Sequence, residues 1–186
     1  FSVGDPSSAK NSDWGSKETS VEFFGRLNYD YKGKYLFEGN LRYDGASKFA
    51  RGHKWGTFPS FSAGWRLSQV QDLKIRGSWG ILGNQNIGNP YAGADILALG
   101  GRQNNYIFNN LDNVGAAVSV IANKGLTWEQ TTQTNIGVDL QIFKDFSVTA
   151  DYYVKNTSAI LLQLPISSTF GFTDVPFQNA GKMRNK

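Results

Sequence analysis

The chain has 186 residues, of which 40% are hydrophobic, 14% aromatic and 18% charged, with 21 glycines and no cysteine. The lack of cysteine excludes a disulfide framework and a thiolate metal site, and no run reaches the roughly 18 consecutive apolar residues of a membrane helix. The net charge of +4 comes from Lys and Arg residues scattered singly among acids, so we expect no nucleic-acid partner.

Four strands are predicted between residues 21 and 83, after a polar segment at 1–20 that we expect to be a loop. Apolar and polar residues alternate there with a period of two, which indicates β-strands with two different faces. The alternation stops at residues 32–34, resumes beyond them, and appears twice more on either side of residues 68–72. The four strands therefore form two hairpins, joined by a longer connection at 45–56.

The rest of the chain is predicted to hold a very long loop at 84–125, a hairpin at 126–156, and a loop with the start of another strand at 157–186. The hairpin gives the clearest pattern, because two runs of roughly ten residues alternate strictly on either side of a turn at 143–145. The expected connections thus alternate between short turns and long loops.

Strands of this length fit the apolar band of an outer-membrane barrel. At about 3.3 Å per residue and a tilt near 45°, ten residues cover about 23 Å along the membrane normal. Such barrels have short periplasmic turns and long extracellular loops, and a single chain closes with at least about eight strands. We therefore expect an all-β fold, an antiparallel transmembrane β-barrel, as an incomplete fragment of about six to seven strands.

The alternation also predicts which face of each strand touches lipid. Apolar side chains such as Leu27, Leu41 and Val138 share the expected lipid face, and aromatic residues lie toward both of its rims. The expected lumen face carries charges of both signs. We expect these charges to pair across strands and hold the wall or a plug in place, with guidance of a substrate as the alternative.

Parity predicts the strand register as well. Odd-numbered residues are apolar on both sides of residues 32–34, so an odd number of turn residues keeps them on one face. Three turn residues place Tyr31 opposite Tyr35. The same register brings Arg26 within diagonal reach of Glu38. Two further pairs follow in the same way: Ile142 with Phe146, and Leu67 with Leu73.

Several segments resemble one family, the SusC/RagA-type TonB-dependent outer-membrane transporters of Bacteroidetes. In chain order they are FFGRLNYDYKGKYLFEGNLRYDGASKFA, KWGTFPSFSAGWRLSQ, LKIRGSWGILGNQNIG, LTWEQTTQTNIGVDL, DYYVKNTSAILLQLPI and FQNAGKMRNK. The resemblance implies a part of the barrel wall of an importer of oligosaccharides or peptides. It also implies a SusD-like surface lipoprotein as partner, and the TonB complex, reached through an N-terminal part, as energy source. The long insertion after GNQNIG departs from the family, so the ligand is not carried over.

The long loop supplies the candidate ligand-binding residues. Amides that both donate and accept hydrogen bonds, beside aromatic rings, suit the hydroxyls and apolar faces of sugars. With one arginine among them, the candidates are Asn84, Gln85, Tyr91, Arg102, Asn104, Asn105, Tyr106 and Phe108. The same composition is also common in polar loops that bind nothing.

We expect no catalytic, metal or cofactor site, and hence no enzyme. The single histidine, His53, lies in a predicted loop with no partner at catalytic or metal-ligand spacing. The expected location is the cell outer membrane. Two alternatives stay open: a siderophore receptor on the same kind of barrel, and a soluble β-module that binds carbohydrate.

Overall fold

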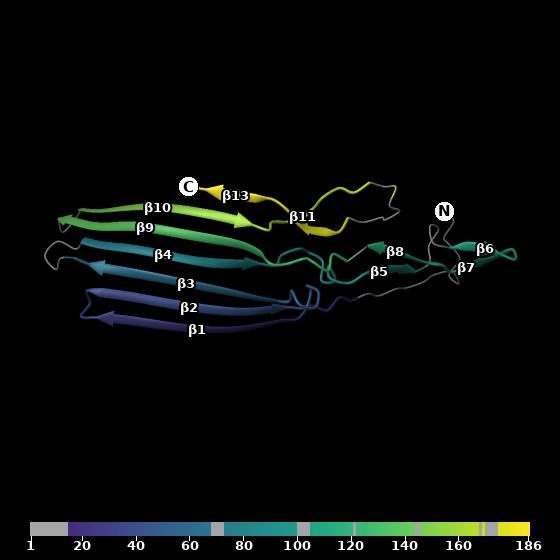
Figure 1. Cartoon of the computed structure of the whole chain (residues 1–186), viewed down its shortest axis with the longest axis horizontal. Helices are drawn as coiled ribbons and strands as arrows, with labels where there is room; N and C mark the ends of the chain where they lie inside the picture. Colours follow the sequence, from purple (N-terminus) through teal and green to yellow (C-terminus); the bar gives the residue numbers. More distant parts are fainter. Residues whose placement is uncertain are drawn as a thin grey trace, which may run out of the picture.

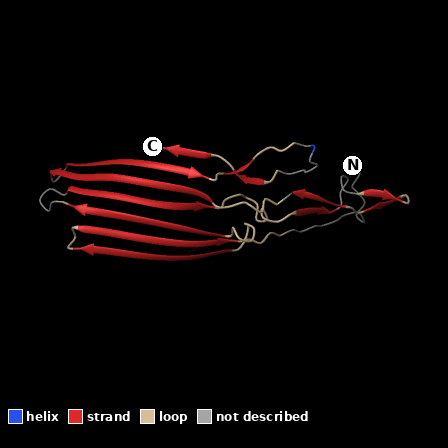
Figure 2. Ribbon diagram, viewed as in Figure 1, coloured by secondary structure: helices blue, strands red, loops and turns tan. Residues whose placement is uncertain are grey.

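A computed structural model shows one open antiparallel sheet with smaller hairpins beyond one of its ends (Figure 1, Figure 2). The structure describes residues 15–67, 73–99, 105–120, 122–143, 146–167, 169 and 175–186. In this part of the chain no helix has the length and apolar character needed to span a bilayer. The main sheet has seven strands, here in spatial order: β1 (Ser20–Tyr31), β2 (Tyr35–Ala46), β3 (Trp55–Arg66), β4 (Leu73–Asn84), β9 (Glu129–Phe143), β10 (Phe146–Ser158) and β13 (Lys182–Asn185).

Short two-stranded hairpins lie beyond the loop end of the sheet, which is the end opposite the turn at residues 32–34 (Figure 1). They are β5 (Ile96–Leu99) with β8 (Ala116–Val120), β6 (Tyr106–Phe108) with β7 (Leu111–Asn113), and β11 (Leu161–Gln163) with β12 (Phe177–Asn179). The segment predicted as a loop at 84–125 therefore contains two hairpins. Strands of three to five residues are too short for an alternating pattern to reveal them.

The strand register confirms the predicted parity at the first two turns. Tyr31 lies opposite Tyr35, and the same register continues along β1 and β2. Beyond the end of β3, the Leu67 N–H donates a hydrogen bond of 2.8 Å to the Leu73 carbonyl, in line with the β3–β4 ladder. Turn parity thus predicts the register within each of these two hairpins.

The predicted pair of Ile142 with Phe146 is wrong. Phe146 lies opposite Phe143, and the register shifts before Ser147, which lies opposite Gln141. From Ser147 onward the ladder follows the predicted parity. A bulge beside the turn absorbs one residue, so both strands keep their faces.

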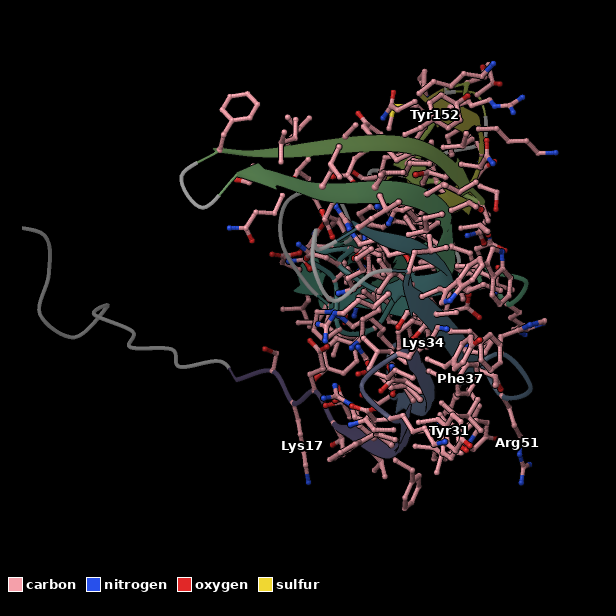
Figure 3. All side chains as sticks on the ribbon, turned by 90° about the vertical axis from the view of Figure 1, so that its left-hand side faces the viewer. Lys17, Tyr31, Lys34, Phe37, Arg51 and Tyr152 are labelled. Carbon is pink, nitrogen blue, oxygen red and sulfur yellow. The ribbon has the colours of Figure 1, made fainter. Side chains whose placement is uncertain are left out.

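Two neighbouring rows of paired residues near the middle of the sheet each keep one chemical character. One row on the apolar face contains Tyr29, Phe37, Ala63, Gly77, Ile136 and Tyr152. The next row, on the polar face, contains Asn28, Glu38, Ser62, Ser78, Asn135 and Tyr153. Figure 3 looks along the strands from the turn end and shows Tyr31 and Phe37 on the same side of the sheet. The result is a wall with one apolar and one polar surface.

Aromatic rings stack across strands on the apolar face. The ring centroid of Phe61 lies 6.5 Å from that of Phe37 and 6.1 Å from that of Trp79. Phe61 stands midway along β3, whereas the sequence predicts aromatic residues toward the two rims of this face. Aromatic contacts therefore cross this face and do not only border it.

Candidate functional site

A buried apolar cluster, which we call the rim core, joins the connections at the loop end of the sheet. The ring centroid of Trp128 lies 5.3 Å from those of both Phe49 and Phe58. The Trp128 Nε1–H donates to the Lys54 carbonyl at 3.2 Å. The rim core consists of Ala46, Phe49, Phe58, Ile87, Ala92, Leu126 and Trp128. It fixes the bases of several loops against one another.

Glycines make room for the rim core. A Cβ at Gly83 would lie 2.0 Å from Cζ of Phe58, and one at Gly56 would lie 2.4 Å from the same atom. A Cβ at Gly93 would lie 2.7 Å from the backbone nitrogen of Ala50. Side chains at these positions would push the Phe58 ring or the neighbouring backbone away.

The segment before β1 is tied to the same end of the sheet. The buried Lys48 ammonium lies 2.7 Å from the Glu18 carboxylate. The Lys17 N–H donates to the phenol oxygen of Tyr91 at 3.1 Å. Tyr91, a predicted ligand residue, therefore has a role in holding this segment in place.

Asn84 and Gln85 also lie at the loop end. The Asn84 amide donates to Glu129 Oε1 at 3.2 Å, and its oxygen accepts the Asn86 N–H at 3.0 Å. Gln85 is half-buried, and its Oε1 has no hydrogen-bond partner among the described residues. The amide of Asn84 is thus already used in joining two strand ends.

The other predicted ligand residues lie farther out. Tyr106 and Phe108 are 58% and 71% exposed on β6, and the Asn105 amide donates to Asp112 Oδ2 at 3.1 Å. Figure 1 places β6 beyond β5 and β8, away from the sheet. Arg102 and Asn104 lie outside the described residues. The six described candidates therefore form two groups and not one pocket.

The polar face of the sheet holds a cavity of about 510 Å³ toward its turn end. Acidic side chains, Asp30 and Glu38, line it from β1 and β2, and basic side chains, Lys74 and Arg76, line it from β4. A second cavity of about 330 Å³ shares four of its lining residues: Glu38, Ser62, Ser78 and Asn135. The polar face is thus hollowed over its central strands.

Arg76 joins three neighbouring strands on this face. Its Nε lies 3.1 Å from Asp139 Oδ2 on β9, and its Nη2 lies 2.7 Å from Asp151 Oδ2 on β10. Arg26 Nε lies 4.0 Å from Glu38 Oε1. These contacts confirm that charges on the polar face pair across strands.

Gly137 gives the Arg76 side chain its path to β10. A Cβ at this position would lie 2.7 Å from Arg76 Cζ and 2.5 Å from Asp151 Oδ1. We therefore expect Gly137→Ala and Asp151→Asn in the full-length barrel to remove the same contact. Each should lower the thermal unfolding midpoint, and the double variant should fall no further than the worse single variant.

Gly77→Ala is the matched control for this prediction. Gly77 also lies inside a strand, but its Cβ would meet only the Asn135 carbonyl, at 3.9 Å. This variant should stay close to the parent midpoint in detergent. Additive losses for Gly137→Ala and Asp151→Asn would show that position 137 does not serve the contact.

Comparisons with known proteins agree with this geometry. The family model described as TonB dependent receptor-like, beta-barrel matches residues 1–186. The chain is 34% identical over 173 residues to TonB-dependent receptor P39 of Formosa agariphila, covering 88% of this chain and 16% of that protein. It is 33% identical over 183 residues to TonB-dependent receptor SusC of Bacteroides thetaiotaomicron, covering 92% and 18%.

Solved structures give the same likeness. A structure of the RagAB peptide transporter matches with a TM-score of 0.77 and 26% identity, over 90% of this chain and 19% of that chain. Another, of the RagAB peptide importer in the 'open-open' state, matches with a TM-score of 0.76 and 25% identity, over 96% of this chain and 20% of that chain. This chain spans about a fifth or less of the length of these proteins.

Proposed function

Because the chain belongs to the TonB-dependent receptor-like β-barrel family, we propose that it is part of the wall of an outer-membrane barrel that imports oligosaccharides. The observation that carries the proposal is the uncovered apolar face of the main sheet. Leu27, Ile136 and Tyr152 are each more than half exposed on it. A soluble module buries such a face within its own fold, whereas lipid covers it in a barrel.

Two substrate classes are proposed in order. Oligosaccharides come first, because the amide of Gln85 lies at the loop end, and the amide of Asn105 lies with the exposed rings of Tyr106 and Phe108 on the hairpin beyond it. Peptides come second, because the similar RagAB structures are those of a peptide transporter. Both classes enter through the same end of the barrel.

The proposed orientation and partners follow from this barrel. Short turns face the periplasm, and the rim core with its loops faces outside. A SusD-like surface lipoprotein sits at the loop end and presents the substrate. The TonB complex supplies energy through a part of the protein that precedes this segment.

Uptake by cells tests the proposal. A strain lacking the full-length gene and its parent are given labelled oligosaccharides or labelled oligopeptides, with and without a functional TonB. We expect the parent alone to take up one of the two classes, and only while TonB works. Equal uptake by both strains of both classes would refute import by this protein.

Removing residues 100–110 from the full-length transporter should leave barrel assembly intact and lower uptake. Assembly should persist because surface loops tolerate loss better than strands. We expect ligand binding to become about tenfold weaker, which corresponds to a loss of about 1.4 kcal/mol of binding free energy. A Gly/Ser linker of equal length is the control for loop length, and gel mobility before and after heating reports assembly. Unchanged binding and uptake in both variants would remove this segment from the ligand site.

A further inference from the structure

The turn between β1 and β2 carries two lysines beside the aromatic edge of the apolar face. Tyr31, Tyr35 and Trp65 form the last row of that face before the turn, and neighbouring rings in it stack with centroids 6.4 Å apart. The Lys32 ammonium lies 5.2 Å from the centroid of the Tyr31 ring. The Lys34 ammonium lies 5.6 Å from that of the Tyr35 ring. These cation–π contacts bring two positive charges to the border of the apolar face.

Hydrogen bonds fix the turn that carries these lysines. The Lys34 N–H donates to the Tyr31 carbonyl at 3.0 Å. The Gly33 N–H donates to Asp30 Oδ1 at 2.7 Å. From β3, Arg66 Nη1 donates to the Gly33 carbonyl at 3.2 Å and brings a third cation to the turn. Figure 3 shows Tyr31 and Lys34 at this end of the sheet. A turn held in this way offers a ligand charges that are already in place.

Lysine is an unfavourable residue at position 32. Its φ angle is +56°, and that of Gly33 is +61°. Turns with two such residues prefer asparagine or glycine, because left-handed backbone crowds the Cβ of other residues. Turn geometry therefore does not explain why a lysine stands here. Backbone strain of this kind is often found at functional positions.

The surroundings of the two lysines suit a lipid headgroup. Neither Lys32 nor Lys34 forms an ion pair within the part of the chain that the structure describes. Both are exposed, and Tyr31, Tyr35 and Trp65 are each more than 40% exposed. Aromatic rings next to cations are typical of the level at which acyl chains meet headgroups. The negative charge at that level is the phosphate of an anionic phospholipid.

We propose that this turn binds the headgroup of an anionic phospholipid in the periplasmic leaflet, a site that rests on the orientation given with the proposed function. The phosphate pairs with the ammonium groups of Lys32 and Lys34, and Arg66 adds positive potential. The acyl chains cover the rings of Tyr35 and Trp65. The site attaches this part of the wall to one class of lipid at a fixed depth.

Fluorescence quenching at Trp65 tests the site in the full-length transporter. The protein is placed in phosphatidylcholine vesicles that contain either brominated phosphatidylglycerol or the same amount of brominated phosphatidylcholine. The contribution of Trp65 is the difference between proteins with and without Trp65→Phe. We expect brominated phosphatidylglycerol to quench Trp65 more strongly, because the neighbouring lysines concentrate this lipid there.

Removing either lysine should weaken this lipid preference. Lys32→Asn and Lys34→Gln should each lower it about fivefold, and asparagine suits the positive φ angle at position 32, so the turn stays formed. Lys32→Arg keeps the charge and should keep the preference. The matched control is Lys124→Gln, because Lys124 is exposed between β8 and β9, on the side of the loops. This control should match the parent.

Several outcomes overturn the site. One is an unchanged preference in both Lys32→Asn and Lys34→Gln. Another is an equal loss in Lys124→Gln, which would mean that net charge alone attracts the lipid. Inorganic phosphate should leave the preference as it is in chloride of equal ionic strength, and displacement by phosphate would assign the site to the free ion.

The same measurement separates the site from the proposed function. If neither brominated lipid quenched the tryptophan fluorescence of the parent, the protein would not lie in the bilayer, and the proposed barrel would be refuted. If both lipids quenched Trp65 equally, the barrel would stand and only the headgroup site would be refuted. Neither result depends on which substrate is transported.

Discussion

Arginine at Val138 should lower the unfolding free energy of the full-length barrel by about 2–4 kcal/mol, the cost of a cation on the lipid face near the bilayer midplane. Val138 lies in β9 between Ile75 of β4 and Ala150 of β10, in one row of the apolar face. A guanidinium there has neither water nor an acidic neighbour in that row. Equilibrium unfolding by urea in lipid bilayers measures the loss.

Asn135→Arg is the matched control on the same strand. Asn135 lies on the polar face, where its amide donates to Ser78 Oγ at 3.2 Å and its oxygen accepts from Gln133 at 3.1 Å. Arginine would lose these two bonds, but its charge would enter a hollowed polar surface that includes Glu38. The loss should be clearly smaller than at Val138. Equal losses at the two positions would reverse or abolish the assignment of the faces.

Removing the Trp128 ring should destabilise the loop end by about 3–5 kcal/mol, the usual cost of deleting a buried large aromatic side chain. Trp128 is only 6% exposed, packs against Phe49 and Phe58, and donates to the Lys54 carbonyl. In Trp128→Ala the loop at 47–54 should lose its support. Thermolysin cleavage within this loop, measured against urea concentration, reports its opening free energy.

Trp128→Phe separates packing from hydrogen bonding. It keeps an aromatic ring in the rim core but leaves the Lys54 carbonyl without its indole donor, so we expect a loss of about 1–3 kcal/mol. Trp55→Ala serves as a second control, because Trp55 is 47% exposed on the apolar face and lies outside the rim core. If thermolysin cleaved residues 47–54 of Trp128→Ala only at the urea concentration that the parent requires, the rim core would not hold this loop.

The wall could be predicted from the sequence because its rules are local. A period of two assigns each residue to a face, and the parity of a turn decides which residues meet across it. Tyr31 opposite Tyr35 follows from residues 27–41 alone. The bulge at Phe146 could not be predicted in this way, because shifting one residue beside a turn leaves the alternation beyond it unchanged.

The loop end could not be predicted in the same way. Trp128, Phe49 and Phe58 meet there from segments about 70 residues apart, and no periodic pattern links them. The two ligand-candidate groups were separated for the same reason: Asn84 ends β4, while Tyr106 lies on a short hairpin of its own.

The rim core and the wall respond differently to temperature. The rim core buries apolar surface away from water, so it is stabilised by the hydrophobic effect. This effect is mainly entropic near room temperature and becomes weaker on cooling. The apolar face of the wall, against lipid in the proposed barrel, is held by ladder hydrogen bonds that lipid cannot replace. Cold should therefore loosen the loop bases while the ladders persist. In the proposed barrel, a fall in temperature would therefore free the loop end long before the wall.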